Sequence, residues 1–196
     1  MTAHPIYFLR HGETQWNLER RLQGQRNIEL NATGHGQAKA MAAKLAEILP
    51  DPAGFEFHVS PLSRTRQTMS YVQEAYGIDD DALVIDDRLM ELNFGDWEGS
   101  MWSEVDKVAP SPQTDPEGYH DWLPENGESY VTAGERVAAW YGDLTAPAIV
   151  VSHGGISRIL RGQVFNLPKR EIVQLKVPQT RFYRIADGGI DWFDAR

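Results

Sequence analysis

The sequence predicts a single α/β domain in which helices cover both faces of a sheet. Short apolar segments bounded by turn residues alternate along the chain with longer segments whose apolar residues recur every three or four positions. This alternation is typical of α/β proteins. A length of 196 residues suits one domain, which we expect to span 1–196 and to carry an insert at about 100–128 over the active site.

Four short segments are predicted to be buried strands. Each is rich in apolar or β-branched residues and is flanked by polar or turn residues, as buried strands are. They are Ile6–Leu9, Phe57–Val59, Leu83–Ile85 and Ala148–Val151.

Four helices are predicted between and after these strands. Asn31 can cap a helix that runs to about Leu49, before Pro50. A second helix follows Leu62 and ends at Gly77, a third follows Ser129, and a fourth follows Gly155. The apolar residues expected to be buried on the third helix are Val131, Val137, Ala138, Tyr141 and Leu144.

Composition excludes several classes of protein. The chain has 41% hydrophobic residues and no cysteine, so disulfides, thiolate catalysis and cysteine-ligated zinc are excluded. No apolar run approaches the roughly 20 residues that span a bilayer. A net charge of −9 disfavours nucleic-acid binding. We therefore expect a cytoplasmic protein with neither a membrane nor a nucleic acid as partner.

The predicted insert contains four prolines and two glycines between Ala109 and Gly127, which excludes long regular structure. The residues in and near the insert are rich in aromatic rings. These side chains either line a pocket for part of a substrate, its leaving group, or pack against one another to stabilise the loop. They are Trp102, Tyr119, His120, Trp122 and Tyr130.

Two of the predicted strands end in a histidine followed by glycine. His11 follows the first strand and His153 follows the fourth. Ligands of α/β sheets bind outside the carboxyl ends of the strands, and a glycine such as Gly154 lets backbone N–H groups approach an anion. The pattern predicts a phosphate pocket with a histidine nucleophile.

Two arginines and one acid complete this candidate site. Arg10 ends the first strand, and Arg64 follows the second at the start of a helix, so both can offer forked donors to phosphoryl oxygens. Glu91 is the candidate general acid for the leaving oxygen. The other carboxylates of its acidic run, including Glu98, are expected on the loop surface.

Each residue alone also has a structural interpretation. A histidine at a strand end can be a satisfied core residue, and Arg64 can be a surface charge on its helix. Metal binding by His11 and His153 is a third interpretation, although the sequence lacks the ligand spacings typical of metal sites.

Taken together, five ordered blocks resemble the histidine phosphatase superfamily, also called the phosphoglycerate mutase-like family. The resemblance covers nearly the whole chain. The blocks are Arg10–Thr14 with Trp16-Asn17, Arg21–Gly24 with Leu30–Gly34, Ser60–Thr65, Glu91 with Phe94–Gly99, and Ser152–Gly155.

The resemblance implies a three-layer α/β/α fold around a mixed, mostly parallel sheet with one antiparallel strand. It implies that His11 attacks phosphorus and becomes phosphohistidine, with Glu91 as general acid and base. Arg10, Arg64 and His153 would hold the phosphoryl oxygens. Phosphate contacts are also implied for Asn17, Gln23, Gly24 and Gly154. Neither a metal nor another cofactor is implied, and the substrate would be a small phosphorylated metabolite.

Departures from the mutase branch favour a phosphatase. In mutases the acid is followed by Arg-His-Tyr-Gly, and a lysine stands eleven residues after the acid. In this chain Leu92–Gly95 follows Glu91, and Trp102 stands at the position of the lysine. Ala109–Gly127 contains no lysine or arginine, so we expect the chain to lack the cations for a second anionic group. Gly95–Gly99 instead resembles the branch of broad-specificity and α-ribazole phosphatases.

Three alternatives stay open from the sequence. One is a bisphosphoglycerate-dependent mutase, and another is a phosphatase acting on a phosphoprotein. The third is a catalytically silent module that senses a phosphorylated metabolite. The sequence determines neither the substrate nor the oligomeric state.

Overall fold

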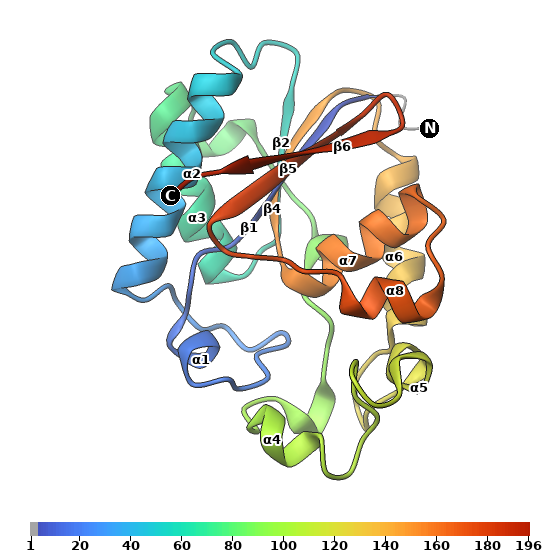
Figure 1. Cartoon of the computed structure of the whole chain (residues 1–196). Helices are drawn as coiled ribbons and strands as arrows, with labels where there is room; N and C mark the ends of the chain where they lie inside the picture. The colour runs from blue at the N-terminus through green and yellow to red at the C-terminus, as the bar shows by residue number, and fades with distance from the viewer. Residues whose placement is uncertain (1–3) are drawn as a thin grey trace.

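A six-stranded sheet lies between two layers of helices (Figure 1). The structure, a computed structural model, describes residues 4–196. In it the strands lie in the order β3-β2-β4-β1-β5-β6. Their bounds are β1 Ile6–Arg10, β2 Glu56–Val59, β3 Leu83–Ile85, β4 Ala148–Ser152, β5 Arg181–Ala186 and β6 Gly189–Asp194.

The sheet is mixed, as the family resemblance implied. β1 pairs in parallel with β4, β4 with β2, and β2 with β3. β5 runs antiparallel to both β1 and β6 and is therefore the one reversed strand of this sheet in the described residues 4–196. The three-layer α/β/α prediction is confirmed.

One strand prediction needs correction. Leu83–Ile85 is a strand, but it is not buried, because β3 lies at the edge of the sheet. Val84 is 40% exposed and Ile85 is 53% exposed. An apolar run alone does not distinguish a central strand from an edge strand.

On one face of the sheet lie α2 (Ala32–Ile48) and α3 (Ser63–Tyr76). Asn31 caps α2 as predicted, since its side chain accepts a hydrogen bond from the Gly34 N–H at 2.8 Å. Gly77 ends α3 in the left-handed conformation, with φ of 65°. Alternate residues of β1, Tyr7 and Leu9, pack under these helices.

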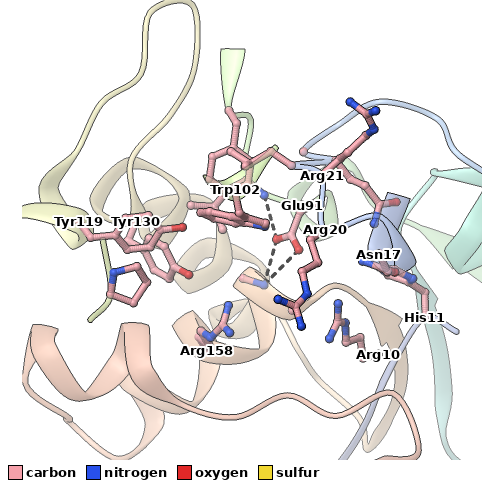
Figure 2. Close-up of a pocket in the computed structure, with 18 of the residues that line it drawn as sticks. Arg10, His11, Asn17, Arg20, Arg21, Glu91, Trp102, Tyr119, Tyr130 and Arg158 are labelled. Carbon is pink, nitrogen blue, oxygen red and sulfur yellow. Dashed lines mark hydrogen bonds between the residues drawn. The ribbon is translucent and has the colours of Figure 1, made fainter. Parts of the chain in front are cut away.

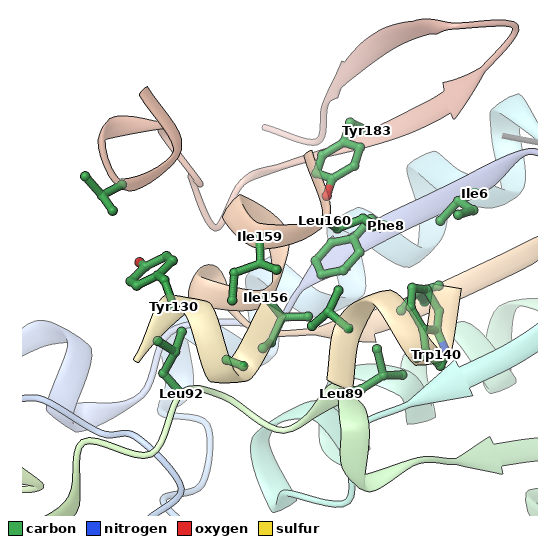
Figure 3. Packing of buried hydrophobic residues seen from close by; sticks show 14 of the residues in the cluster. Ile6, Phe8, Leu89, Leu92, Tyr130, Trp140, Ile156, Ile159, Leu160 and Tyr183 are labelled. Carbon is green, nitrogen blue, oxygen red and sulfur yellow. The ribbon is translucent and has the colours of Figure 1, made fainter. Parts of the chain in front are cut away.

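On the other face lie α6 (Tyr130–Gly142) and α7 (Gly154–Val164). They pack on Ile6 and Phe8, the intervening residues of β1 (Figure 3). The Phe8 ring stacks on that of Tyr183, with centroids 5.3 Å apart.

The predicted buried face of α6 is partly wrong. Val131 and Ala138 are exposed. The helix instead turns Tyr130, Ala133, Val137 and Trp140 inward. Trp140 lies deep in this face of the core (Figure 3) and donates to Nδ1 of His58 at 3.2 Å.

Several short elements were not predicted. Figure 1 shows three small helices, α1, α4 and α5, beyond the carboxyl ends of the parallel strands, and α8 beside α7. Their bounds are α1 Gln15–Leu18, α4 Trp102–Val105, α5 Pro116–Asp121 and α8 Lys169–Gln174. Three 3-10 turns complete the described elements: Asp80–Ala82, Asp87–Leu89 and Gly95–Trp97. No helix within residues 4–196 is long and apolar enough to cross a membrane.

The strand order places the candidate site at the centre of the sheet. The chain leaves β1 toward α2 on one face and leaves β4 toward α7 on the other, so a crevice forms between the two strand ends. Arg10 and Ser152 are register partners at these ends. The residues that follow them, His11 and His153, are thereby brought side by side.

Candidate active site

A pocket of about 420 Å³ opens beyond the carboxyl ends of β1 and β4. Eight of the nine predicted site residues line it, and His153 does not. The eight are Arg10, His11, Asn17, Gln23, Gly24, Arg64, Glu91 and Gly154. Segments that are far apart in the sequence therefore meet in one cavity (Figure 2).

His11 is only 2% exposed, and its ring is oriented by a hydrogen bond at Nδ1. Nδ1 lies 2.7 Å from the carbonyl oxygen of Gly12, which can only accept a hydrogen bond. Nδ1 therefore carries the proton and Nε2 carries the lone pair. Burial, followed by the charges of Arg64 and Arg10, lowers the pKa of His11 well below 6.5, so the ring is neutral at pH 7.

His153 lies beside His11, fully buried, with its ring edge-on to that of His11 and the centroids 5.2 Å apart. Its Nε2 lies 2.8 Å from the Ser60 hydroxyl. When Ser60 donates this hydrogen bond, Nδ1 carries the proton. Burial, with the charge of Arg64 next, lowers the pKa of His153 as well, so this ring is also neutral.

Arg10 and Arg64 are each anchored by backbone carbonyls. Arg10 donates to the carbonyl of Val177, and Arg64 donates to those of Arg26 and Gly24, all at 2.7 Å. Burial lowers the pKa of each arginine to about 10, which leaves both charged at pH 7.

Three buried donors at the site have no acceptor among the described residues. They are Nε of Arg10, Nε of Arg64 and Nδ1 of His153. Leaving a buried donor unsatisfied costs about 1–3 kcal/mol, and more for a charged group. An anion is the kind of ligand that supplies acceptors to such nitrogen atoms.

Glu91 extends from the loop after β3, and its carboxylate is oriented by backbone amides (Figure 2). The Gly155 N–H donates to both carboxylate oxygens at 3.0 and 3.1 Å, and the Leu92 N–H donates at 3.0 Å. A Cβ atom at position 155 would collide with Glu91 and Leu92, so this approach requires glycine.

Arg136 on α6 supports the loop that carries Glu91. Its guanidinium donates to the carbonyls of Arg88, Met90 and Glu91, at 2.6 to 3.1 Å. It also pairs with Glu128. Nothing in the sequence distinguishes this arginine from an ordinary helix charge.

The predicted phosphate contacts are mostly engaged with protein. Asn17 Oδ1 accepts from the Thr14 N–H and from Gln179, at 3.2 and 2.9 Å. Gln23 Oε1 accepts from the Thr14 hydroxyl at 2.9 Å. The Gly24 carbonyl accepts a hydrogen bond from Arg64 and thereby orients the arginine. The amide N–H groups of Asn17 and Gln23 side chains are the atoms they can offer to phosphate.

Glu98 is a correction to the predicted loop-surface carboxylates. Its side chain is 7% exposed, and it accepts hydrogen bonds from the N–H groups of Gln25 and Phe94 at 2.7 and 3.3 Å. Gly24 has a φ of 51° and leaves no room for a Cβ beside this carboxylate. Glu98 thus ties the loop of Gln23 and Gly24 to the loop of Glu91.

The expectation that the site lacks further cations is wrong. Arg20, Arg21 and Arg158 also line the pocket. None of them belongs to the insert, where the sequence analysis looked for such charges. Arg158 lies on α7 and the other two follow α1.

The aromatic residues near the insert divide between the two roles left open. Trp102, Tyr119 and Tyr130 line the pocket. Trp122 and His120 instead pack on the neighbouring rings, with centroids about 6 Å apart.

Residues 4–196 contain no cluster of three or more His, Cys, Asp or Glu side chains arranged to hold a metal ion. The chemistry of the pocket is that of an oxyanion site: forked cations, neutral imidazoles and one oriented carboxyl.

Comparison with known proteins gives consistent results. A family model described as histidine phosphatase superfamily (branch 1) matches residues 6–192. A glucosyl-3-phosphoglycerate phosphatase of Mycobacterium tuberculosis is 30% identical over 181 residues, 86% of this chain and 78% of that protein. A probable phosphoglycerate mutase GpmB of an Enterobacter species is 33% identical over 187 residues, 92% of this chain and 83% of the relative.

A solved structure of mycobacterial glucosyl-3-phosphoglycerate phosphatase in complex with VO3 is similar throughout. Its TM-score is 0.78 at 28% sequence identity, and the match covers 98% of this chain and 97% of that one.

Proposed function

The chain belongs to the histidine phosphatase superfamily, branch 1, and from this premise we propose that it is a metal-independent phosphomonoester hydrolase acting through phosphohistidine at His11. The observation that carries the proposal is the set of three unsatisfied buried donors of Arg10, Arg64 and His153 beside a neutral His11. A phosphoryl group supplies the three acceptors that they need.

In the first step, His11 Nε2 attacks phosphorus and the bond to the leaving oxygen breaks. Glu91, in its protonated form, gives its proton to that oxygen, and the alcohol departs. The two arginines and the Nδ1–H of His153 hold the phosphoryl oxygens as charge spreads over them, which is the main source of catalysis in phosphoryl transfer.

In the second step, water attacks the phosphorus of phosphohistidine. Glu91, now a carboxylate, takes a proton from the water, and the P–N bond breaks to release inorganic phosphate. Microscopic reversibility assigns both proton transfers to the same group. His11 regains its lone pair and Glu91 its proton, so the cycle closes without a metal.

A pocket of about 420 Å³ suits a small organic phosphate better than a folded phosphoprotein. The relatives' names agree, since glucosyl-3-phosphoglycerate is such a metabolite. We therefore place the substrate among small phosphorylated metabolites.

The mutase alternative has two observations in its favour. One relative is a probable phosphoglycerate mutase, and additional arginines line the pocket. The mutase is the correct alternative if the chain isomerises phosphoglycerate faster than it releases phosphate and if this isomerisation depends on bisphosphoglycerate.

Phosphate release in excess chelator tests the proposal directly. The panel should include α-ribazole phosphate, glucosyl-3-phosphoglycerate, phosphoglycerate and an aryl phosphate. We expect release to persist in chelator and to be abolished in His11→Ala, because the nucleophile is lost. His35→Ala, which removes a histidine that contacts Tyr71 and does not line the pocket, is the matched control and should retain the rate.

Trapping the intermediate adds an independent test. Rapid quenching with base should leave labelled phosphate on the wild-type chain, because phosphohistidine is stable in base and labile in acid. A folded His11→Ala variant that still turns over at the wild-type rate would refute the mechanism.

A further inference from the structure

The pocket has two chemically different ends (Figure 2). His11, Arg10 and Asn17 lie at one end, and the rings of Tyr119 and Tyr130 lie at the other. The proposed phosphoryl transfer uses only the first end and Glu91. The second end therefore faces the leaving group of the substrate.

The pocket contains more positive charge than one phosphoryl group requires. Five arginines line it against two carboxylates, Glu91 and Asp106. Arg10 and Arg64 serve the phosphoryl group. Arg21 is paired with Glu19 at 2.7 Å and also donates to the Gly99 carbonyl. Two arginines remain, and they are Arg20 and Arg158.

Arg158 is fixed but not neutralised. Its Nε–H donates to the Leu175 carbonyl at 2.9 Å, which sets the plane of the guanidinium. No carboxylate of the described chain lies within ion-pair distance of it. Because Nε is engaged, the terminal NH2 groups, which contact the Tyr130 hydroxyl, are the atoms that a ligand would meet. Such a fork matches the two oxygens of a carboxylate.

Arg20 is the second cation, and its backbone is strained. Its φ is 58°, in the left-handed region that non-glycine residues rarely adopt. Its carbonyl accepts from the Trp102 N–H at 3.0 Å, so the strained residue is tied to the aromatic wall. Figure 2 shows its side chain reaching into the pocket, and within residues 4–196 it forms no ion pair or hydrogen bond.

Three aromatic rings form the wall beside these cations. The centroids of Trp102 and Tyr119 are 6.3 Å apart, and those of Tyr119 and Tyr130 are 5.7 Å apart. Burial raises the pKa of both tyrosines, so their hydroxyls stay protonated and are neutral donors. Rings packed on one another offer a rigid apolar surface to a planar or ring-shaped group.

We propose that Arg158, assisted by Arg20, binds a second anionic group of the substrate, a carboxylate on a leaving group that packs against Trp102, Tyr119 and Tyr130. This rests on the proposed phosphatase function and names its substrate class. Substrates with a carboxylate on the leaving group are then favoured over neutral analogues of the same shape.

Two matched aryl esters isolate this charge. Carboxyphenyl phosphate and carbamoylphenyl phosphate differ only in carboxylate against carboxamide, and the 3- and 4-substituted pairs sample two distances. We expect wild-type kcat/KM to favour the carboxylate at least tenfold in one pair. Arg158→Met should remove this preference, because kcat/KM for the carboxylate ester should fall at least tenfold more than kcat/KM for the carboxamide ester. Arg20→Met should reduce the preference.

Lys107→Met is the matched control, because it removes one positive charge from the exposed surface of the insert without touching the pocket. It should retain the full preference. Circular dichroism confirms folding of each variant, and Arg158→Gln provides a second truncation if Arg158→Met does not fold. Equal kcat/KM for carboxylate and carboxamide in both pairs overturns the proposal, as does a preference that Arg158 variants retain.

Binding separates this proposal from the proposed reaction. In the His11→Ala background, calorimetry measures the affinity of each ester without turnover. At least tenfold tighter binding of a carboxylate ester, lost when Arg158→Met is added, supports the second anion site even if no ester is hydrolysed. Equal affinities for the carboxylate and carboxamide esters refute the second anion site. In that case, hydrolysis of either ester by the wild type still supports the phosphatase function.

Discussion

The two histidines at the strand ends differ in which ring nitrogen is engaged. His11 uses Nδ1, against the Gly12 carbonyl, and leaves the lone pair on Nε2, the proposed nucleophile. His153 uses Nε2, against the Ser60 hydroxyl, and leaves Nδ1 without a partner, so Nδ1 is a donor when Ser60 donates to Nε2. The Gly12 carbonyl fixes the tautomer of His11, whereas the Ser60 hydroxyl can donate or accept, so the two His-Gly sequences engage different ring nitrogens.

Glu91→Gln tests the proton transfer at the scale of one atom. The amide retains the shape of the side chain but cannot give a proton to the leaving oxygen. Alkyl phosphates, which have poor leaving groups, should lose about 10²–10⁴-fold in kcat/KM, and a nitrophenyl ester should lose far less. Steady-state kinetics on both esters measures the difference. Glu125→Gln, on the exposed loop, should change neither rate, and equal slowing of both esters would contradict the acid role.

Single residues were predictable where a strand end marked them. Arg10 ends β1, His11 and His153 directly follow β1 and β4, and Arg64 lies in the first turn of α3, which follows β2, so sheet geometry brings them together. Arg158 has no such marker, because a lone arginine within a helix reads as a surface charge. Glu98 was missed for a similar reason, since its burial depends on the Gln25 and Phe94 amides that it meets only after folding.

At the scale of elements, the His11 loop packs against the first turn of α2 with no space for side chains. A Cβ on Gly12 would collide with the Gly34 backbone, and a Cβ on Gly34 would collide with the Glu13 backbone. Asn31 caps the same turn and its amide donates to Glu13 at 2.9 Å. The start of α2 therefore positions the nucleophile loop.

Two alanine substitutions on α2 test this contact. Gly34→Ala should displace the loop, lower the free energy of unfolding by about 1–3 kcal/mol and reduce kcat. Gly36→Ala, in the same helix with nothing within 4 Å of its Cβ, should raise it by about 0.5–1 kcal/mol, because alanine is the better helix former. Urea denaturation measures both, and similar effects of the two substitutions would refute the close packing.

Helices and strands were predicted correctly where the sequence spacing of their apolar residues was regular. Asn31 caps α2, Gly77 ends α3, and α7 has clear apolar spacing. The inward face of α6 was predicted partly wrong, because Val131 and Ala138 are apolar but exposed. The β5–β6 hairpin was missed, although Asp187-Gly188 is a strong turn signal and both residues have positive φ, 53° and 76°.

At the scale of the whole molecule, the site depends on both cores at once. β1 and β4 are central strands whose side chains alternate between the two faces of the sheet. Arg10 is anchored on Val177, 167 residues away, and the Glu91 loop is anchored by Arg136 of α6. The site therefore forms only when the complete sheet and both helical layers are in place.

Neutral burial of His11 and His153 makes the stability of the whole chain depend on pH. Both pKa values lie well below 6.5 in the folded protein, because burial and then nearby arginines disfavour the charged ring. In the unfolded chain each ring titrates near 6.5. Between these values the unfolded state binds more protons, so stability is fully present above about pH 6.5 and falls as the pH decreases.

The expected slope is up to about 1.4 kcal/mol per pH unit for each of the two histidines below pH 6.5. Urea denaturation from pH 7.5 to pH 5 measures it. Carboxylates such as Asp86, whose pKa is lowered by its hydrogen bonds with Arg88, lose their contribution at a lower pH, so the window near pH 6 reports mainly on histidine. His11→Gln and His153→Gln should each reduce the slope of the unfolding free energy against pH by up to the contribution of one proton, about 1.4 kcal/mol per pH unit. An unchanged slope in the double variant would show that the buried rings are not the cause, and the neutral state on which the nucleophile depends would lose this support.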